Sequence, residues 1–421
     1  MRLGTLLLTA GLAAAAIPQE EYKVRRAALR QALPEGAVVV LQGSTESEKG
    51  DLRTPFIQEP NFLYLTGWRE PGAALVLTKT GEEFYLPKRS EVRERYTGHK
   101  LAPGDSDATS VTGFETVLAS DDFADRVAKT TGTLYVLSKT GSAEKVKQAA
   151  PGRDFADAAP LIAHLRMTKS SAEVEALQFA VDSSVEAHKA GMRRAAPGIA
   201  EYQIAATMSA VYFERGCERH AYPPIVASGP NAVTLHYSAN KRRMDAGELL
   251  LMDVGAECAD YAADITRTIP VNGKFSARQR EIYDIVLGAQ KAAIAAAKPG
   301  MRLLGLEEDS LNGIAYRYVN SHGKDQKGEP LGKYYLHSLG HHVGLEVHDA
   351  FDPDLRLQPG MVVTIEPGIY LAGERIGVRI EDMILITESG AKLLTEALPR
   401  EAKEIERFLA RREKRARPAT N

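Results

Sequence analysis

Residues 245–253 read Asp-Ala-Gly-Glu-Leu-Leu-Leu-Met-Asp, and residues 358–366 read Gln-Pro-Gly-Met-Val-Val-Thr-Ile-Glu. In both stretches a glycine stands six positions before an acid, Asp253 or Glu366, and mostly apolar residues fill the interval. A short apolar run that begins after a turn residue predicts a buried strand. The two stretches therefore predict a pair of equivalent strands, each of which carries an acid where it ends.

The sequence around these two stretches also repeats in the same order. Ser170 with Glu173, and Ser276 with Gln279, form capping-box patterns that begin long amphipathic helices. Each long helix is followed by a Pro-Gly stop and then by a second helix. In the first copy the stop is at 197–198 and the second helix at 201–215; in the second copy the stop is at 299–300 and the second helix at 306–320. This repetition predicts a duplicated domain over 161–410, with a pseudo-two-fold axis.

The first part of the chain shows no such repeat. Helical spacing over 19–33 is followed by short apolar strands, which we place at 36–41, 62–68, 73–78, 83–86 and 134–137. Strands that alternate with helices predict a smaller α/β domain over 17–160. The predicted fold class of the whole chain is α/β (α+β).

Length and charge limit the classes of protein to which the chain can belong. With 421 residues, two domains are expected. Lys and Arg number 53 against 55 Asp and Glu, so no global field favours nucleic acid or an anionic membrane as a partner. The basic end, residues 411–421, is predicted to be a frayed, solvated tail. No nucleic-acid partner and no stable membrane insertion are expected.

The first sixteen residues differ in kind from the rest. Arg2 precedes a nearly uncharged run that is rich in Leu and Ala and too short for a membrane span. The run Ala14-Ala15-Ala16 offers an A-x-A cleavage site. We read residues 1–16 as a signal peptide that directs the protein to the periplasm or outside the cell; an ordinary apolar helix and a cytoplasmic location are the alternative.

The two cysteines, Cys217 and Cys258, are too few for a disulfide framework. Neither belongs to a CxxC motif. Cys258 lies in a strand-like segment and is predicted to be a small, buried, apolar side chain.

A second acid follows the first in each copy. Asp264 comes eleven residues after Asp253, and Glu381 comes fifteen after Glu366. Acids that close apolar runs are costly to bury unless a cation receives them. The duplicated fold is thus expected to bring a carboxylate pair from each half to its centre, beside cations.

Two kinds of cation compete for these carboxylates. Arg267 and Arg379 would form a salt-bridge network, whereas two divalent ions would form a hydrolytic centre. The spacing favours metal without excluding the arginines. Oxygen-rich ligation with one imidazole suits manganese better than a thiolate zinc site, with cobalt or zinc as alternatives.

Histidines cluster in the second copy. His337, His341 and His348 lie in a glycine-rich segment that is a poor helix, so we expect an irregular or extended backbone. His342 neighbours His341 and is expected to point elsewhere if the segment is extended. His236 holds the corresponding place in the first copy.

Several motifs together resemble a known family. They are LHY (235–237), MDVG (252–255), DITRT (264–268), HSLGHHVGLEVHD (337–349), IEPGIY (365–370) and GVRIED (377–382). The set is similar to the pita-bread metallopeptidases, above all the Xaa-Pro aminopeptidases (aminopeptidase P) and the prolidases. TPFIQEPNFLYLTGWREPGAALVL (54–77) is similar to the aminopeptidase P N-terminal domain.

The resemblance implies a role for each matching residue. The implied metal ligands are Asp253, Asp264, His341, Glu366 and Glu381, of which Asp264 and Glu381 bridge the two ions. The implied catalytic residues are His236, His337, His348, Glu366 and Arg379. His236 and His348 would steady the tetrahedral intermediate and the leaving nitrogen, and Arg379 would orient Glu381. No ligand position is substituted, which argues against the metal-free creatinases and against an inert binding module.

The implied reaction is removal of the N-terminal residue from Xaa-Pro peptides by a water that bridges two metal ions. Glu366 would take and return a proton. A prolidase restricted to dipeptides is the alternative, because the stretch from Tyr370 to Gly377 is short, and a methionine aminopeptidase fits the large first domain less well. Proline-containing peptides are the expected substrates, and the family likeness implies a homodimer or homotetramer.

Overall fold

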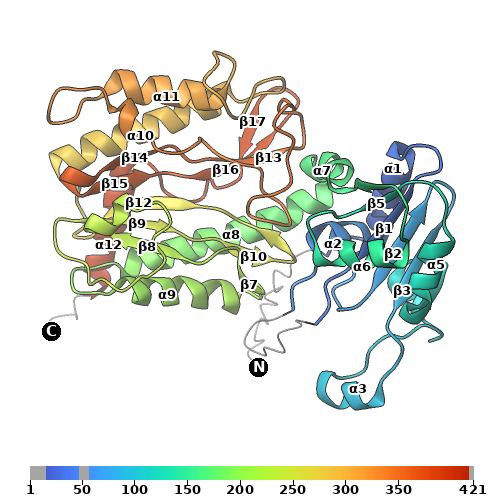
Figure 1. Ribbon diagram of the computed structural model, residues 1–421. Coiled ribbons are helices and arrows are strands. Elements are labelled where there is room, and N and C mark those ends of the chain that lie inside the picture. The colour runs from blue at the N-terminus through green and yellow to red at the C-terminus, as the bar shows by residue number, and fades with distance from the viewer. Residues whose placement is uncertain (1–15, 47–55, 417–421) are drawn as a thin grey trace, which may run out of the picture. The chain divides into compact units, whose positions relative to one another are not determined.

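The computed structural model describes residues 16–46 and 56–416 (Figure 1). They divide into two compact units, one of which is Ile17–Arg166 and the other of which begins at Met167. Nearly all of the predicted signal peptide lies outside the described residues. Among the helices of the described part, none is long and apolar enough to cross a membrane.

The first unit is built on one six-stranded sheet. Its strands are β1 (Val38–Gln42), β2 (Ala74–Thr78), β3 (Glu82–Leu86), β4 (Val117–Ala119), β5 (Leu134–Val136) and β6 (Phe155–Asp157). Their order is β4-β3-β2-β1-β5-β6, with β1 antiparallel to β2 and parallel to β5. The predicted strands at 36–41, 73–78, 83–86 and 134–137 are confirmed by β1, β2, β3 and β5.

Short helices complete this unit. They are α1 (Gln19–Ala32), α2 (Pro60–Thr66), α3 (Glu91–Thr97), α4 (Ala108–Thr112), η1 (Ser120–Asp122), α5 (Phe123–Lys129), α6 (Gly141–Ala149) and α7 (Ala159–Met167). The core of the sheet contains Val38, Val76 and Tyr85, which are buried against helix residues such as Val127 and Val146.

The prediction of a strand over 62–68 is wrong, because this segment forms α2. The Glu59 side chain accepts a hydrogen bond from the Phe62 N–H at 2.7 Å and so caps the helix. Pro60 occupies the first turn, and Gly67 ends the helix in the left-handed region at φ 66°. Capping at both ends outweighs the strand preference of the aromatic and apolar residues between them.

The second unit contains two similar halves. The first half has α8 (Ser171–Arg194), α9 (Glu201–Glu214), β7 (Arg219–His220), β8 (Ile225–Ser228), η2 (Gly229–Val233), β9 (Leu249–Asp253), β10 (Ala256–Cys258), β11 (Tyr261–Ala262) and β12 (Thr266–Pro270). The second half has α10 (Ala277–Ala296), α11 (Leu311–His322), η3 (Leu331–Tyr334), β13 (Val362–Ile365), β14 (Gly368–Leu371), η4 (Ala372–Glu374), β15 (Ile376–Arg379), β16 (Asp382–Ile386) and β17 (Ala391–Leu393), and α12 (Ala402–Ala416) follows.

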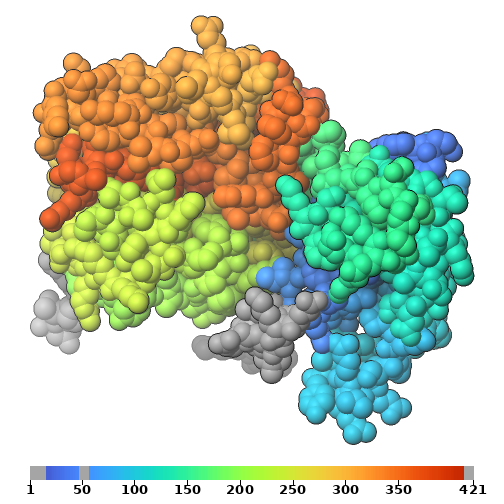
Figure 2. Space-filling model, in the orientation of Figure 1, coloured from blue at the N-terminus to red at the C-terminus, as the bar shows by residue number. Residues whose placement is uncertain are grey.

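The strands of this unit lie between two helix pairs, α8 with α9 on one side and α10 with α11 on the other (Figure 1). The sheet β12-β9-β8 belongs to the first half and β13-β16-β17 to the second. The two halves lie against each other in the space-filling view (Figure 2). The predicted duplication is therefore present in the fold.

Most predicted helix boundaries of this unit are confirmed. Ser170 and Ser276 each accept a hydrogen bond from the backbone three residues on, and Glu173 and Gln279 complete the two capping boxes. The helix expected from residue 306 instead begins at Leu311, because the Ser310 hydroxyl accepts the Gly313 N–H at 2.8 Å and provides the cap. The basic end is helical as far as Ala416, so the expectation of a frayed tail from residue 411 is wrong there.

The two cysteines form a disulfide, so the prediction that Cys258 is only a small apolar side chain is wrong. Both cysteines are buried, as expected for Cys258, but β7 pairs antiparallel with β10 and brings Cys217 beside Cys258. The partners are 41 residues apart, and no local sequence pattern predicts the strand pairing that brings them together.

Removal of this disulfide is expected to destabilise the protein by about 4 kcal/mol, because the bond closes a loop of 41 residues in the unfolded chain. The variant Cys217→Ala/Cys258→Ala should melt at a lower temperature than the oxidised wild type. A reductant should lower the wild-type midpoint and leave that of the variant unchanged. A wild type that is indifferent to reductant even after prolonged unfolding and refolding would argue against the bond.

Candidate metal centre and active-site pocket

The first half of the catalytic unit brings two acids together by strand pairing. Asp253 ends β9, and Asp264 lies two residues before β12. These strands pair antiparallel, with Thr266 opposite Asp253. Side chains near one end of such a pair lie close together. The Tyr222 hydroxyl donates to Asp253 Oδ1 at 2.6 Å and fixes that carboxylate.

The second half provides the other two acids in an equivalent way. Glu366 follows β13 and Glu381 precedes β16, and these strands pair antiparallel with Ile365 opposite Asp382. The halves join where the Glu381 N–H donates to the Thr266 carbonyl at 3.0 Å. The Thr266 hydroxyl also donates to Glu381 Oε2 at 2.7 Å. One residue of the first half thereby holds an acid of the second.

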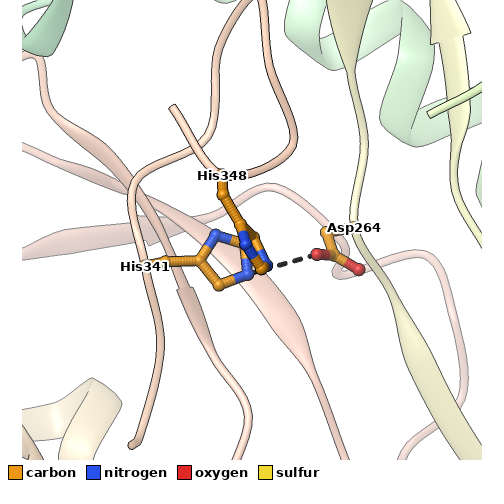
Figure 3. Close-up of side chains that lie close together, drawn as sticks. All are labelled: Asp264, His341 and His348. Atoms are coloured by element: carbon orange, nitrogen blue, oxygen red, sulfur yellow. Dashed lines mark ion pairs between the residues drawn. The ribbon is translucent and has the colours of Figure 1, made fainter. Parts of the chain in front are cut away.

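Three overlapping clusters result, and in each the potential ligand atoms lie within 4.8 Å of one another. They are Asp253-Asp264-Glu381, His341-Glu366-Glu381 and Asp264-His341-His348. His341 Nε2 lies 3.3 Å from Asp264 Oδ2 and 3.5 Å from Glu366 Oε1. Figure 3 shows the rings of His341 and His348 beside each other and facing Asp264. Glu381 belongs to the first two clusters and so links them.

The pKa values of the clustered acids are shifted by burial and by the negative charges that they place close together. Burial raises the pKa of Glu381 well above its usual range, and the charges of Asp264 and Glu366 raise it further. Burial also raises the pKa of Glu366 from 4.5 to about 8. Asp264 is different, because His341 holds its pKa below the usual value despite burial. Burial opposes the charge on His341, but Asp264 and Glu366 raise its pKa to about 9.

This donor set fits divalent metal ions. Three buried carboxylates, the half-buried carboxylate of Glu366 and one imidazole supply hard oxygen ligands with a single nitrogen. Burial and the neighbouring carboxylates raise the pKa values of Glu366 and Glu381, so a positive charge close by would favour their ionised forms. Bound cations would supply that charge.

The two arginines that compete with metal have separate partners. Arg267 is fully buried and donates to Asp382 Oδ1 at 2.6 Å and to the Glu381 carbonyl at 2.7 Å. It therefore pairs with an acid outside the clusters. Arg379 Nη2 donates to Asp253 Oδ2 at 2.6 Å, so the salt-bridge reading is correct for one of the four clustered acids.

Within the described residues, the hydrogen bonds of Arg379 reach Glu381 only through a third side chain. Its Nε donates to Thr266 Oγ1 at 3.2 Å, and that hydroxyl donates to Glu381. Its Nη1 donates to the Tyr370 hydroxyl at 2.8 Å. The hydrogen bonds of Arg379 therefore reach Asp253 directly and Glu381 only through Thr266.

The histidines divide by their surroundings. His337 Nε2 bonds the Tyr370 hydroxyl at 2.8 Å, and its Nδ1 bonds the Ser338 carbonyl at 2.9 Å. Burial and then Arg379 lower the pKa of His337 to about 4, so this ring is neutral. His342 lies outside the three clusters and stacks near Phe351, as expected for a side chain that points elsewhere. The backbone from His337 to Asp349 is irregular, as predicted.

One cavity of about 580 Å³ contains every predicted site residue. These residues are His236, Asp253, Asp264, His337, His341, His348, Glu366, Arg379 and Glu381. Pro223, Ile225, Leu235, Leu304 and Val347 add apolar walls. His236 and His348 are exposed within it and can meet a ligand. The cavity combines charged groups with apolar surface, which is typical of small-ligand sites.

Sequence reasoning missed three hydroxyl side chains that hold the acids and Arg379 in place: Tyr222, Thr266 and Tyr370. Thr266 and Tyr370 lie inside motifs recognised above, and Thr266 follows Asp264 by two residues. Tyr222 precedes Asp253 by 31 residues, and no local signal connects them.

A duplicated α/β catalytic unit with clustered carboxylates defines a metal-dependent hydrolase. Residues 175–388 match metallopeptidase family M24, and residues 22–135 match the aminopeptidase P N-terminal domain. The chain belongs to metallopeptidase family M24, and the fold is the pita-bread fold that the motifs implied.

Relatives of known name support this assignment. The Xaa-Pro aminopeptidase of Haemophilus influenzae is 35% identical, over 94% of this chain and 98% of its own length. Human Xaa-Pro aminopeptidase 3 is 32% identical, over 96% and 88%. The structure of Escherichia coli aminopeptidase P with the inhibitor Pro-Leu matches with a TM-score of 0.87 at 30% identity, over 95% of this chain and 100% of that one. The resemblance is confirmed, and the chain is a metallo-aminopeptidase that depends on divalent metal.

Proposed function

We propose that this enzyme removes the N-terminal residue from peptides whose second residue is proline. The observation that carries the proposal is the pair of clusters that share Glu381 in the lining of a cavity with apolar walls. Two adjacent cations could occupy these clusters and act on one substrate atom. The Xaa-Pro aminopeptidases to which the chain is similar indicate the substrate class.

We assign one ion to the cluster of Asp253, Asp264 and Glu381, and the other to the cluster of His341, Glu366 and Glu381. Asp264 lies near His341 as well as Asp253, which suits a bridging ligand. Manganese is our preferred metal, because hard carboxylate oxygens dominate the set, and cobalt or zinc could replace it. When bound, the metal pair supplies a water that is acidic enough to be deprotonated near neutral pH.

The chain's own residues then handle protons and charge. Glu366 lies beside His341 and borders the cavity, where its carboxylate can take a proton from the attacking water and return it to the leaving nitrogen. His348 and His236 are exposed to the same cavity and can donate to the developing oxyanion and the leaving group. Arg379 and Tyr370 hold Asp253 and His337 in position.

Proline explains why a separate class of peptidase is needed. The Xaa-Pro bond has no N–H, so a protease that docks its substrate as a strand loses a hydrogen-bond donor there. Here the apolar walls can receive the proline ring, and an acid beside it can protonate the ring nitrogen. Selectivity would then come from the cavity and not from backbone pairing.

A second reading is a prolidase restricted to dipeptides. It is favoured by the short connection between β14 and β15, where Leu371 pairs with Ile376 and only η4 and Arg375 intervene.

The test is to measure release of the first residue from Xaa-Pro and from Xaa-Pro-Xaa peptides, with manganese, cobalt or zinc added to stripped protein. We expect the tripeptide to have the higher kcat/KM, with manganese the most effective ion. Cleavage of the dipeptide alone would favour the prolidase reading. No release from either peptide with any ion would refute the proposed function.

We also propose export and self-association. The buried disulfide supports export, because such bonds persist mainly in oxidising compartments. The homodimer or homotetramer is inferred from family likeness alone and is testable by light scattering.

A further inference from the structure

A buried ion pair lies beneath the histidine segment and is not part of the ligand clusters. Lys169 Nζ lies 2.8 Å from Asp349 Oδ2, and the two side chains are 0% and 1% exposed. They are 180 positions apart in the chain. Desolvation makes a buried pair of this kind weak evidence for stability, so its position needs another explanation.

Asp349 directly follows His348 and closes the loop that begins at His341. Its backbone N–H donates to the His342 carbonyl at 2.9 Å, which joins the two ends of that loop. The rings of His341 and His348 lie 4.1 Å apart between their centroids, at the loop ends. The place of Asp349 therefore determines where His348 stands relative to His341.

Lys169 is attached to the backbone just before β13, the strand that leads to Glu366. Its backbone N–H donates to the Gly360 carbonyl at 2.9 Å, and Thr168 forms a β-bridge with Met361, which precedes β13. The next residue, Ser170, caps α8. The backbone of Lys169 is therefore held in place by both a helix and a strand.

Gly344 shows how tightly the loop encloses this pair. A Cβ at residue 344 would lie 2.1 Å from Asp349 Oδ2 and 3.1 Å from Lys169 Nζ, so only glycine fits without displacing the pair. The Gly344 carbonyl accepts the Ala262 N–H at 2.9 Å, which ties the loop to β11, just before Asp264. The ion pair thus lies at a junction of the segments that lead to Asp264, His341, His348 and Glu366.

We propose that Lys169 and Asp349 are positioning residues that set the location of His348 for the reaction. Neither touches the substrate cavity, since neither is among its lining residues. They act through the loop that Asp349 closes. In this way they affect the ability of His348 to stabilise charge or to transfer a proton. The inference rests on the proposed function and deepens it.

A double-mutant cycle with His348→Ala tests this role, using manganese-loaded enzyme and an Xaa-Pro-Xaa peptide. Asp349→Asn keeps the side-chain shape and is expected to lower kcat by roughly 10- to 100-fold, the usual cost of losing a supporting partner. In the His348→Ala background the same substitution should change kcat by less than about threefold, because the group through which it acts is gone. Bound metal per chain should stay the same in all four proteins.

Two further variants separate positioning from folding. Lys169→Met/Asp349→Leu replaces the pair by apolar side chains of similar size and is expected to fold with a lowered kcat. Arg278→Met breaks the ion pair with Glu374, 2.8 Å long and outside the cavity, and should leave kcat within about twofold of the wild type.

Equal losses of kcat in both backgrounds, an unchanged kcat for Asp349→Asn, or a parallel loss of bound metal would each overturn the positioning role. So would failure of both Asp349→Asn and the apolar double variant to fold, which would make the pair a folding determinant. A wild type that is inactive with every ion would instead refute the proposed function.

Discussion

Replacement of Glu381 by alanine is expected to reduce kcat by roughly ten-thousand-fold, the scale of loss when one member of a group that acts as a unit is removed. Glu381 is the residue that links the Asp253-Asp264 cluster to the His341-Glu366 cluster. In the proposed two-ion site, loss of Glu381 would remove one ligand from each ion and the bridge between them. The measurement is steady-state turnover of an Xaa-Pro peptide at saturating metal, with bound metal counted in the same sample.

The fold should survive this change. Burial and the neighbouring carboxylates raise the pKa of Glu381, so the ionised form of Glu381 is disfavoured in the absence of metal. Glu381→Gln keeps the volume and removes the charge, so its metal-free form should melt no lower than the metal-free wild type. Glu388→Ala, at an exposed acid near the end of β16, serves as the control and should retain full activity. Substantial turnover by Glu381→Ala would refute the bridging role.

Removal of metal is expected to abolish turnover and to lower the melting temperature, and addition of manganese should reverse both. A ligand that binds only the folded state stabilises it by about 4 kcal/mol when its free concentration is 1,000 times its Kd. Two ions at neighbouring sites should each contribute on this scale. Differential scanning fluorimetry of stripped and reloaded protein, beside an activity assay, measures both effects.

This stabilisation should grow with pH. In the stripped protein the folded pKa of Glu366 is raised from 4.5 to about 8, and that of His341 is raised from 6.5 to about 9. Between about pH 4.5 and 9 the folded state therefore holds more protons than the unfolded state, so stability of the stripped protein falls as pH rises. Metal replaces these protons, and the gain in melting temperature on reloading should be larger at pH 8.5 than at pH 6. An equal gain at both values would contradict the assignment of Glu366 and His341 as ligands.

Much of the site was visible in the sequence because its acids lie at the ends of short apolar strands. Asp253 and Glu366 close such runs, and the structure places both beside one cavity. The hydroxyls that orient them were not visible. Tyr222 and Asp253 are 31 residues apart, and no sequence pattern predicts a hydrogen bond between residues at that separation.

Errors in the predicted fold arose where local signals conflict or are absent. The segment at 62–68 has strand-like composition, yet Glu59, Pro60 and Gly67 make it a helix. Residues 306–310 have helical spacing, but Ser310 delays the start of α11. In both cases a capping interaction decided against the periodicity of the apolar residues.

The amino-acid sequence by itself determined the two-domain organisation, the duplication of the catalytic unit, its long capped helices and the acids at its strand ends. These features follow from local periodicity and capping, which act over a few residues. Only the tertiary structure decided that Glu381 joins two ligand clusters, that Cys217 bonds Cys258, and that Lys169 pairs with Asp349. Contacts of this kind depend on strand register and on the packing of one half against the other, and these are set by the whole chain at once.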